Sequence, residues 1–167
     1  MSGAHAHVDS SNRKVAMLIA ILALVLAISE TLGKSAQTTG LSANIEASNL
    51  WAFFQAKTVR MSVLRTASEQ VEAGLPFADA KAREALEKRI ASWKKTAERY
   101  DAEPETQEGR KELAARAKAA EKKRDYSLAA YHHFEIASAA VQIAIVLASA
   151  EVITGVVALV WLSGALG

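Results

Sequence analysis

Two carboxylates lie within or beside long apolar runs and are the first candidates for chemistry in this sequence. Glu30 follows the run Val15 to Ile28, and Glu151 lies between the apolar runs 136–150 and 152–167. A carboxylate at membrane depth is by default a candidate for ion or proton handling. Both residues also lie at expected helix ends, so an interfacial or capping role is the alternative.

The histidines are the second candidates, because imidazole binds metal ions. His132, His133 and Glu135 form a His-His-x-Glu string. Adjacent residues on a helix point about 100° apart, so one chain cannot direct both histidines to one ion. Interfacial anchoring is the preferred interpretation. His5 and His7 precede any apolar pattern and lack preorganisation for a metal site.

Other catalytic arrangements are not found in the sequence. It contains no glycine-rich phosphate loop, no serine nucleophile elbow and no zinc-protease helix. With no cysteine, thiol chemistry and disulfides are excluded. A net charge of +2 over interleaved acids and bases does not form the basic stripe that nucleic acids require. We therefore expect a protein that is not an enzyme, has no metal or cofactor and does not bind nucleic acid.

The stretch NLWAFFQAK gathers three aromatic residues, Trp51, Phe53 and Phe54, in a chain where aromatics are scarce. Aromatic side chains bury large areas and are common in helix contacts. Core or subunit packing is the preferred role. A ligand pocket and an aromatic belt at the bilayer surface are the alternatives.

The elements that position these residues follow from the distribution of charge. Of the 20 Lys and Arg residues, 18 lie between Lys34 and Arg124, and none follows Arg124. Between residues 34 and 134 the strong helix formers predominate, which predicts an all-α protein. Charge is thus segregated into one central region.

The segment 13–32 is long and apolar enough for a transmembrane helix, preceded by a disordered tail over 1–12. A cleaved signal peptide is the alternative, since Arg13 and Lys14 resemble a basic leader, but no cleavage box closes the run. One face of this helix carries small residues at spacings of four, three and four, which predicts close contact with another helix. These residues are Ala16, Ala20, Ala23 and Ala27.

Residues 33–133 predict an extramembrane, coiled-coil-like helical domain. Helices are expected over 41–73, over 77–100 and from about Thr106, with breaks at Gly74 to Pro76 and at Asp101 to Pro104. Glycine at position 74 suits a left-handed helix cap. A kinked helical hairpin or a three-helix bundle accommodates these lengths.

The helix expected over 41–73 has two apolar faces and therefore needs two partners. One face includes Ile45, Ala52, Ala56, Val59, Val63 and Ala67; the other includes Leu50, Phe54, Met61 and Leu64. The chain's own helices can cover one face. We expect the second to contact a neighbouring subunit, because its large side chains would otherwise form an apolar patch unusual on a monomer.

The C-terminal residues predict a membrane hairpin. Residues 134–151 form a second transmembrane helix, and residues 155–167 form a short or incomplete third one. Thr154 and Gly155 provide the turn, which places Glu151 near a headgroup layer.

The strings IEASNLWAFFQAKTVR and FEIASAAVQIAIVLAS, in this order around the charged domain, resemble the bacterial membrane family described as domain of unknown function 4337. The resemblance covers nearly the whole chain and implies the same helical membrane architecture. In that family a basic loop typically follows the second membrane helix, whereas this sequence has EVITG there. The resemblance implies no activity.

The expected function follows from this architecture. Arg13 and Lys14 favour an internal N-terminus and a periplasmic domain at the bacterial inner membrane, while Lys122, Lys123 and Arg124 favour the opposite orientation. We expect a non-enzymatic scaffold in the lipid bilayer, as a homo-oligomer or as an accessory subunit with other membrane proteins. The alternative is a component of an ion, proton or small-solute transport system.

Overall fold

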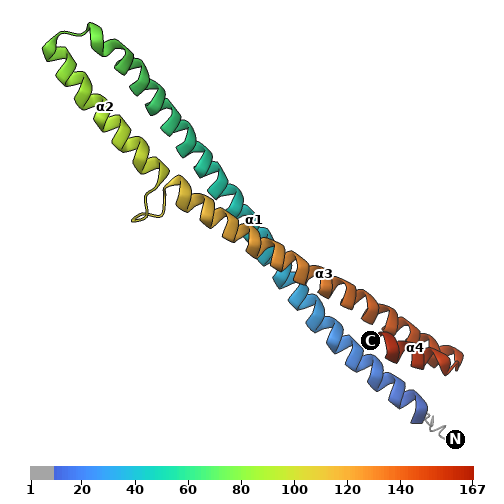
Figure 1. Ribbon diagram of the computed structural model, residues 1–167. Helices are drawn as coiled ribbons and strands as arrows, with labels where there is room; N and C mark the ends of the chain where they lie inside the picture. The colour runs from blue at the N-terminus through green and yellow to red at the C-terminus, as the bar shows by residue number, and fades with distance from the viewer. Residues whose placement is uncertain (1–9) are drawn as a thin grey trace, which may run out of the picture. The chain divides into compact units, whose positions relative to one another are not determined.

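The computed structural model describes residues 10–167, and all its long elements are helices (Figure 1). They are α1 (Ser10–Gly74), the 3-10 helix η1 (Leu75–Phe77), α2 (Ala80–Asp101), α3 (Arg110–Thr154) and α4 (Ala158–Leu166). The all-α prediction is confirmed. Residues 1–9 of the expected N-terminal tail lie outside the described residues, and residues 10–12 already belong to α1.

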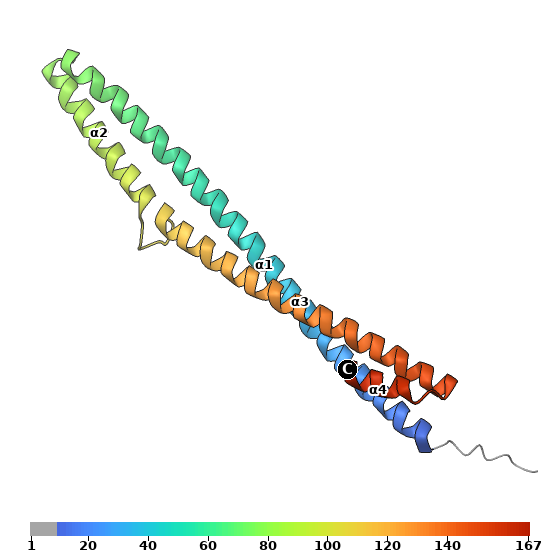
Figure 2. The ribbon, with the colours of Figure 1, turned by 45° about the vertical axis from the view of Figure 1, so that its right-hand side comes forward.

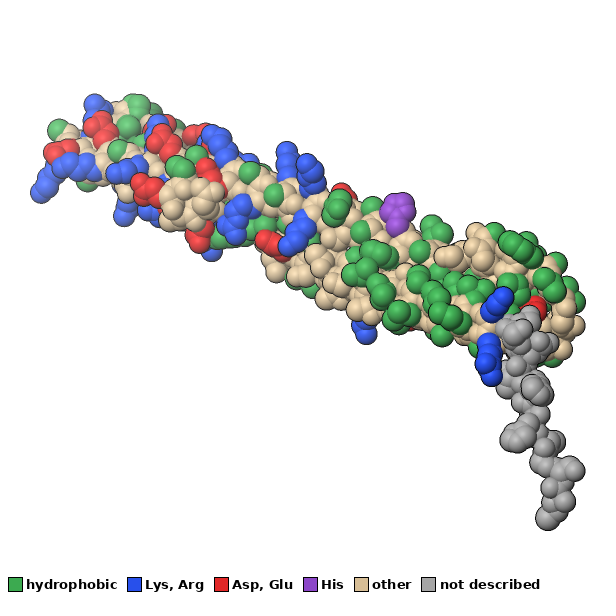
Figure 3. Space-filling model, turned by 90° about the horizontal axis from the view of Figure 1, so that it is seen from below, with side chains coloured by type: hydrophobic (Ala, Val, Ile, Leu, Met, Phe, Trp, Pro, Cys, Tyr) green, Lys and Arg blue, Asp and Glu red, His purple; other side chains and the backbone are tan. Residues whose placement is uncertain are grey.

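The chain divides into two compact units. The apolar unit contains the chain up to Gly40 together with Tyr126–Gly167, and the charged unit is Leu41–Asp125. On the face seen in Figure 3, acidic and basic side chains gather over the charged unit, whereas hydrophobic side chains predominate over the apolar unit. The segregation in the sequence is therefore also a division in the structure.

The charged unit is a helical hairpin whose returning arm is divided into two helices. In both ribbon views α2 and the first part of α3 lie beside α1 (Figures 1 and 2). Residues of α1 that are buried or half-buried recur at alternating spacings of four and three: Ala43, Ala47, Leu50, Phe54, Lys57, Met61, Leu64, Ser68 and Val71. This spacing keeps one helix face toward its partner. The hairpin corresponds to the first of the two predicted forms.

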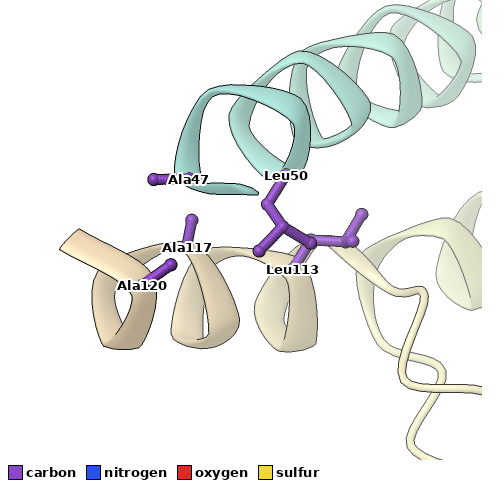
Figure 4. Packing of buried hydrophobic residues seen from close by; sticks show 5 residues of the cluster. All are labelled: Ala47, Leu50, Leu113, Ala117 and Ala120. Carbon is purple, nitrogen blue, oxygen red and sulfur yellow. The ribbon is translucent and has the colours of Figure 1, made fainter. Parts of the chain in front are cut away.

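Small side chains at the centre of this hairpin let α1 and α3 approach closely. Leu50 of α1 reaches toward Leu113 and Ala117 of α3 (Figure 4), and Ala47 and Ala120 belong to the same buried cluster. Leu113 and Ala117 have no exposed surface. This contact is the hydrophobic core of the charged unit.

The turn between α1 and α2 forms by a different route from the predicted one. Gly74 has φ −84°, so the expected left-handed cap at this residue is wrong. The 3-10 helix containing Pro76 ends the hydrogen-bond ladder instead, since proline has no N–H. The Asp79 side chain then accepts a hydrogen bond from the Ala82 N–H at 2.8 Å and caps α2.

The loop before α3 extends further than the sequence predicted, because α3 begins at Arg110 and not near Thr106. Gln107 has φ 60°, which a helix cannot contain. A Cβ atom on Gly109 would lie 2.8 Å from the carbonyl carbon of Ala102, so the backbone packs too closely there for any side chain. These two residues keep the loop irregular.

In the apolar unit, two glycines of α1 set the distance to α3. A Cβ atom on Gly33 would lie 3.2 Å from the Phe134 Cβ, and one on Gly40 would lie 3.0 Å from the Leu128 Cδ2. Glycine at such contacts lets helix backbones approach closely, as in membrane helix pairs. Further along, a small cluster of Leu22, Val141 and Ala144 completes the packing.

The C-terminal helix turns back at the expected position. α3 ends at Thr154, and Gly155 follows with φ 68°, a conformation that glycine adopts readily. The Ser163 hydroxyl of α4 donates a hydrogen bond to the Ala144 carbonyl oxygen at 2.8 Å. With nine residues, α4 is shorter than the ~20 that a bilayer core requires.

Candidate functional site

The charged unit contains a buried lysine, Lys57, at a core position of α1. Its ammonium lies 3.7 Å from a Glu103 carboxylate oxygen and 4.0 Å from one of Glu108. It also lies 5.3 Å from the ring centre of Phe53 and 5.1 Å from that of Tyr100. Burial of a charge is costly unless it is paired, and these four groups provide the pairing.

Arg110, at the first residue of α3, makes the second cationic contact. Its guanidinium donates hydrogen bonds to the Thr58 hydroxyl at 2.9 Å and to the Asp101 carboxylate at 3.1 Å. It lies 4.9 Å from the ring centre of Phe54. One side chain therefore joins α1, the end of α2 and the start of α3.

Asp101 is held ionised at this junction. The Lys111 ammonium, 3.0 Å away, is the main cause that lowers the pKa of Asp101, and the nearby charges of Arg110 and Arg65 add to it, while partial burial opposes the shift. The native contacts thus favour the charged form of the carboxyl.

We call Lys57, Arg110 and Asp101 with their partners the junction cluster. Each of its charges lies near a group of opposite charge, and these partners lie on α2, on α3 and in the loop before α3. Trp51 adds a further cross-helix contact, since its indole N–H donates to Glu121 at 2.9 Å. The arrangement suits a structural role, since it fixes the two pieces of the returning arm against α1.

The apolar unit contains a groove of about 400 Å³ between α1 and α3. The Gln142 amide donates a hydrogen bond to Glu30 at 3.2 Å across it. Glu135 lines the same groove and accepts a hydrogen bond from the Tyr131 hydroxyl at 3.3 Å. Glu30 is thus a paired, exposed carboxylate at this groove.

Glu151, by contrast, is buried near the end of α3. Among the residues that the structure describes, none forms a hydrogen bond with its Oε2 atom. A buried carboxylate oxygen without a hydrogen-bond partner is rare and energetically unfavourable.

His132 and His133 lie on one exposed stretch of α3. His132 Nδ1 lies 3.3 Å from Glu135 Oε2, and both side chains are exposed. Within residues 10–167 there is no group of three or more side chains of the types that hold a metal ion. His5 and His7 lie outside the described residues.

One comparison with known proteins gives a result. The family model described as Domain of unknown function (DUF4337) matches residues 11–167. The chain belongs to this family. No curated protein and no solved structure matches it.

In this DUF4337 protein, the small-residue stripe on α1 is exposed and lies outside the buried clusters of the described residues. Ala16, Ala20, Ala23 and Ala27 are all exposed. The residues that face α3 in this part of the chain are others, among them Leu22, Gly33 and Gly40. Whether the stripe contacts another helix stays a prediction.

The apolar face of α1 that was expected to contact a neighbouring subunit packs within the chain instead. Leu50 and Met61 are buried, and Phe54 and Leu64 are half-buried, so the face assigned to a neighbour packs within the chain. The reason is that α2 and α3 bring small residues and ring-stacking cations to this side. The other face, which includes Val59, is exposed.

Sequence reasoning missed Lys57 and Arg110. A charged residue in a helix with many charges is expected to be exposed to solvent. The packing role was therefore assigned to the neighbouring rings of Phe53 and Phe54. A signal was present, because Lys57 lies three residues after Phe54 and four before Met61. This spacing places Lys57 on the buried face of α1.

Phe54→Ala is expected to destabilise the subunit without changing its association. The ring packs on the core cluster, edge-to-face with Trp51 at 5.4 Å. Truncation of a half-buried ring should cost about 2 kcal/mol, below the ~3 to 5 of a fully buried one. Thermal melts should show a lower Tm and mass photometry an unchanged mass. Phe77→Ala is the matched control, because that ring is 90% exposed; equal Tm values for the two variants would contradict this packing.

Asp101→Asn should remove a pH-dependent part of the stability. The folded pKa of Asp101 lies below the ordinary value of 3.8, so its contribution is fully present above that pH and disappears as the pH falls through the folded pKa. In urea titrations the wild type should exceed Asp101→Asn in stability at pH 7, and the difference should shrink below about pH 4. Glu105→Gln, at an exposed loop position, serves as control. A difference that is constant with pH would contradict the assignment.

Proposed function

We propose that this chain is an integral membrane scaffold whose residues 13–32 and 134–151 span a bilayer. The observation that carries the proposal is the direction of the large apolar side chains in the apolar unit. Met17 is 67% exposed and Ile136 is 70% exposed, on α1 and α3 respectively. Side chains of this kind on the outside of a helix pair are suited to lipid and unsuited to water.

The extent of burial supports lipid contact over a soluble core. α1 and α3 each contain a segment long and apolar enough to cross a membrane, and only 11% and 28% of these segments are buried within the protein. The core helix of a soluble protein would be mostly buried. A signal sequence would account for the segment near the N-terminus but not for the one in α3.

The scaffold role is based on the contacts that the cationic side chains of the charged unit make. Buried Lys57 and half-buried Arg110 contact carboxylates and aromatic rings of other helices, and such contacts stabilise the fold. We propose a non-enzymatic protein of the bacterial cytoplasmic membrane, whose coiled-coil-like charged unit lies outside the bilayer, on the periplasmic side, and associates with further copies or with other membrane subunits.

A second candidate function is favoured by the unpaired Oε2 atom of Glu151. An ionised carboxylate at membrane depth needs a cation or a proton, and such residues mark ion and proton pathways. In this alternative the chain is a component of a transport system for protons, ions or small solutes.

Alkaline carbonate extraction of membranes tests the scaffold proposal. The wild-type chain should stay in the membrane pellet. Leu24→Lys combined with Val146→Lys adds one charge to each proposed span, at about 2.5 to 3.5 kcal/mol each for insertion, and should move the protein to the soluble or aggregated fraction. Ala85→Lys combined with Ala115→Lys adds the same charge at exposed sites of the charged unit and should not. Release of the wild type by carbonate would contradict membrane insertion.

Glu151→Gln distinguishes the two candidate functions. For a transport component, proton or cation flux in liposomes containing the purified chain should fall severalfold, with the protein still inserted. Glu135→Gln, at the groove of the apolar unit, is the matched control. Wild-type flux no greater than that of empty liposomes would remove the transport alternative and leave the scaffold.

A further inference from the structure

Residues 41–74 of α1 have an uncharged face opposite the buried one. At about 100° per residue, residues 45, 49, 52, 56, 59 and 63 all lie within about 40° of one line along the helix. We call them the seam: Ile45, Asn49, Ala52, Ala56, Val59 and Val63. They recur at spacings of four and three, as the buried face does.

The seam residues are exposed on the surface of the single chain. Ile45, Val59 and Val63 are 54%, 62% and 61% exposed, and the other three seam residues are also exposed. The charged residues of this part of α1 all lie to its sides or on the buried face; they are Glu46, Lys57, Arg60, Arg65, Glu69 and Glu72. An apolar stripe bordered by charge on a helix in a highly charged unit is the pattern of a helix–helix contact.

We propose that two copies of this chain associate through the seam, with their α1 helices parallel and in register. In such a pair each seam residue meets its own copy. Asn49 then meets Asn49, and the two amides can hydrogen-bond to each other, an arrangement that specifies register in parallel helix pairs. Ala52 and Ala56 permit close approach, while Ile45, Val59 and Val63 interlock.

The antiparallel arrangement is less suitable. It would place Asn49 against Val59 and leave its amide unpaired in an apolar contact, which is unfavourable. In the parallel pair, Arg60 lies opposite Gln55 of the second copy and Glu46 lies opposite its Leu41, so no like charges are opposed. This orientation rests on the proposed function, because two chains anchored in one bilayer by residues 13–32 share one polarity.

The absence of cysteine from the sequence makes disulfide crosslinking a direct test. Val63→Cys in the purified full chain should form a disulfide with itself under mild oxidation, in at least tenfold higher yield than Arg65→Cys. Arg65 is also exposed but points about 200° away around the helix. Equal yields would overturn the proposal. Crosslinking of Val63→Cys only when mixed with Ile45→Cys would overturn the parallel orientation.

A second variant separates this inference from the scaffold proposal. Val59→Glu should convert the dimer to a monomer in mass photometry, with unchanged helix content by circular dichroism, since the residue is exposed in each chain. A multimer that persists in Val59→Glu would overturn the seam but retain the scaffold. A wild-type chain that is monomeric at all concentrations tested would overturn the seam as well as the homo-oligomer, and carbonate extraction would still report on membrane insertion.

Discussion

Close approach of α1 and α3 at small side chains is the constraint on which both units depend. Gly33 and Gly40 set it in the apolar unit, and Ala47 with Ala117 sets it in the charged unit. Where two backbones approach this closely, little volume remains between them for large side chains. Other large apolar residues, such as Met17 in the apolar unit and Val59 in the charged unit, are exposed. For the exposed apolar residues we propose lipid as the contact in the apolar unit and a second copy of α1 in the charged unit.

Charged contacts fix the axial register of α1 against α3, which the contacts between small residues do not specify. Glycine and alanine contacts are nearly the same after a slip of one turn, so they specify an axial position poorly. A one-turn slip, however, would move Arg110 about 5.4 Å from Thr58 and leave a partly buried guanidinium without its partners. Uncompensated burial of charge is strongly destabilising, and polar groups in a core are a known means of fixing register. The junction cluster therefore complements the small-residue packing.

The helical class and the breaks at Pro76 and Gly155 could be read from the sequence, because proline and glycine act locally on the backbone. The two apolar faces of α1 could be read as well, but not which one packs inside. Periodicity reports that a face is apolar, whereas its partner depends on distant residues such as Leu113 and Ala117. Likewise, the spacing places Lys57 on the face of Phe54 and Met61, but only the structure shows the rings and carboxylates that surround its buried ammonium. The late start of α3 depends on the φ angle of Gln107, which no local rule predicts.

Glu30 and Glu151 looked alike in the sequence, yet the structure gives them different surroundings. Glu30 is exposed at a groove and accepts a hydrogen bond from Gln142. Glu151 is buried with an oxygen that no described residue contacts through a hydrogen bond. Exposure lets Glu30 draw on headgroups or water, so its charge needs no special explanation. Burial denies Glu151 this access, and in the membrane insertion that we propose, a proton, a cation or a neighbouring chain takes the place of solvent. The choice between the scaffold and the transport proposals therefore depends on which of these three partners Glu151 has.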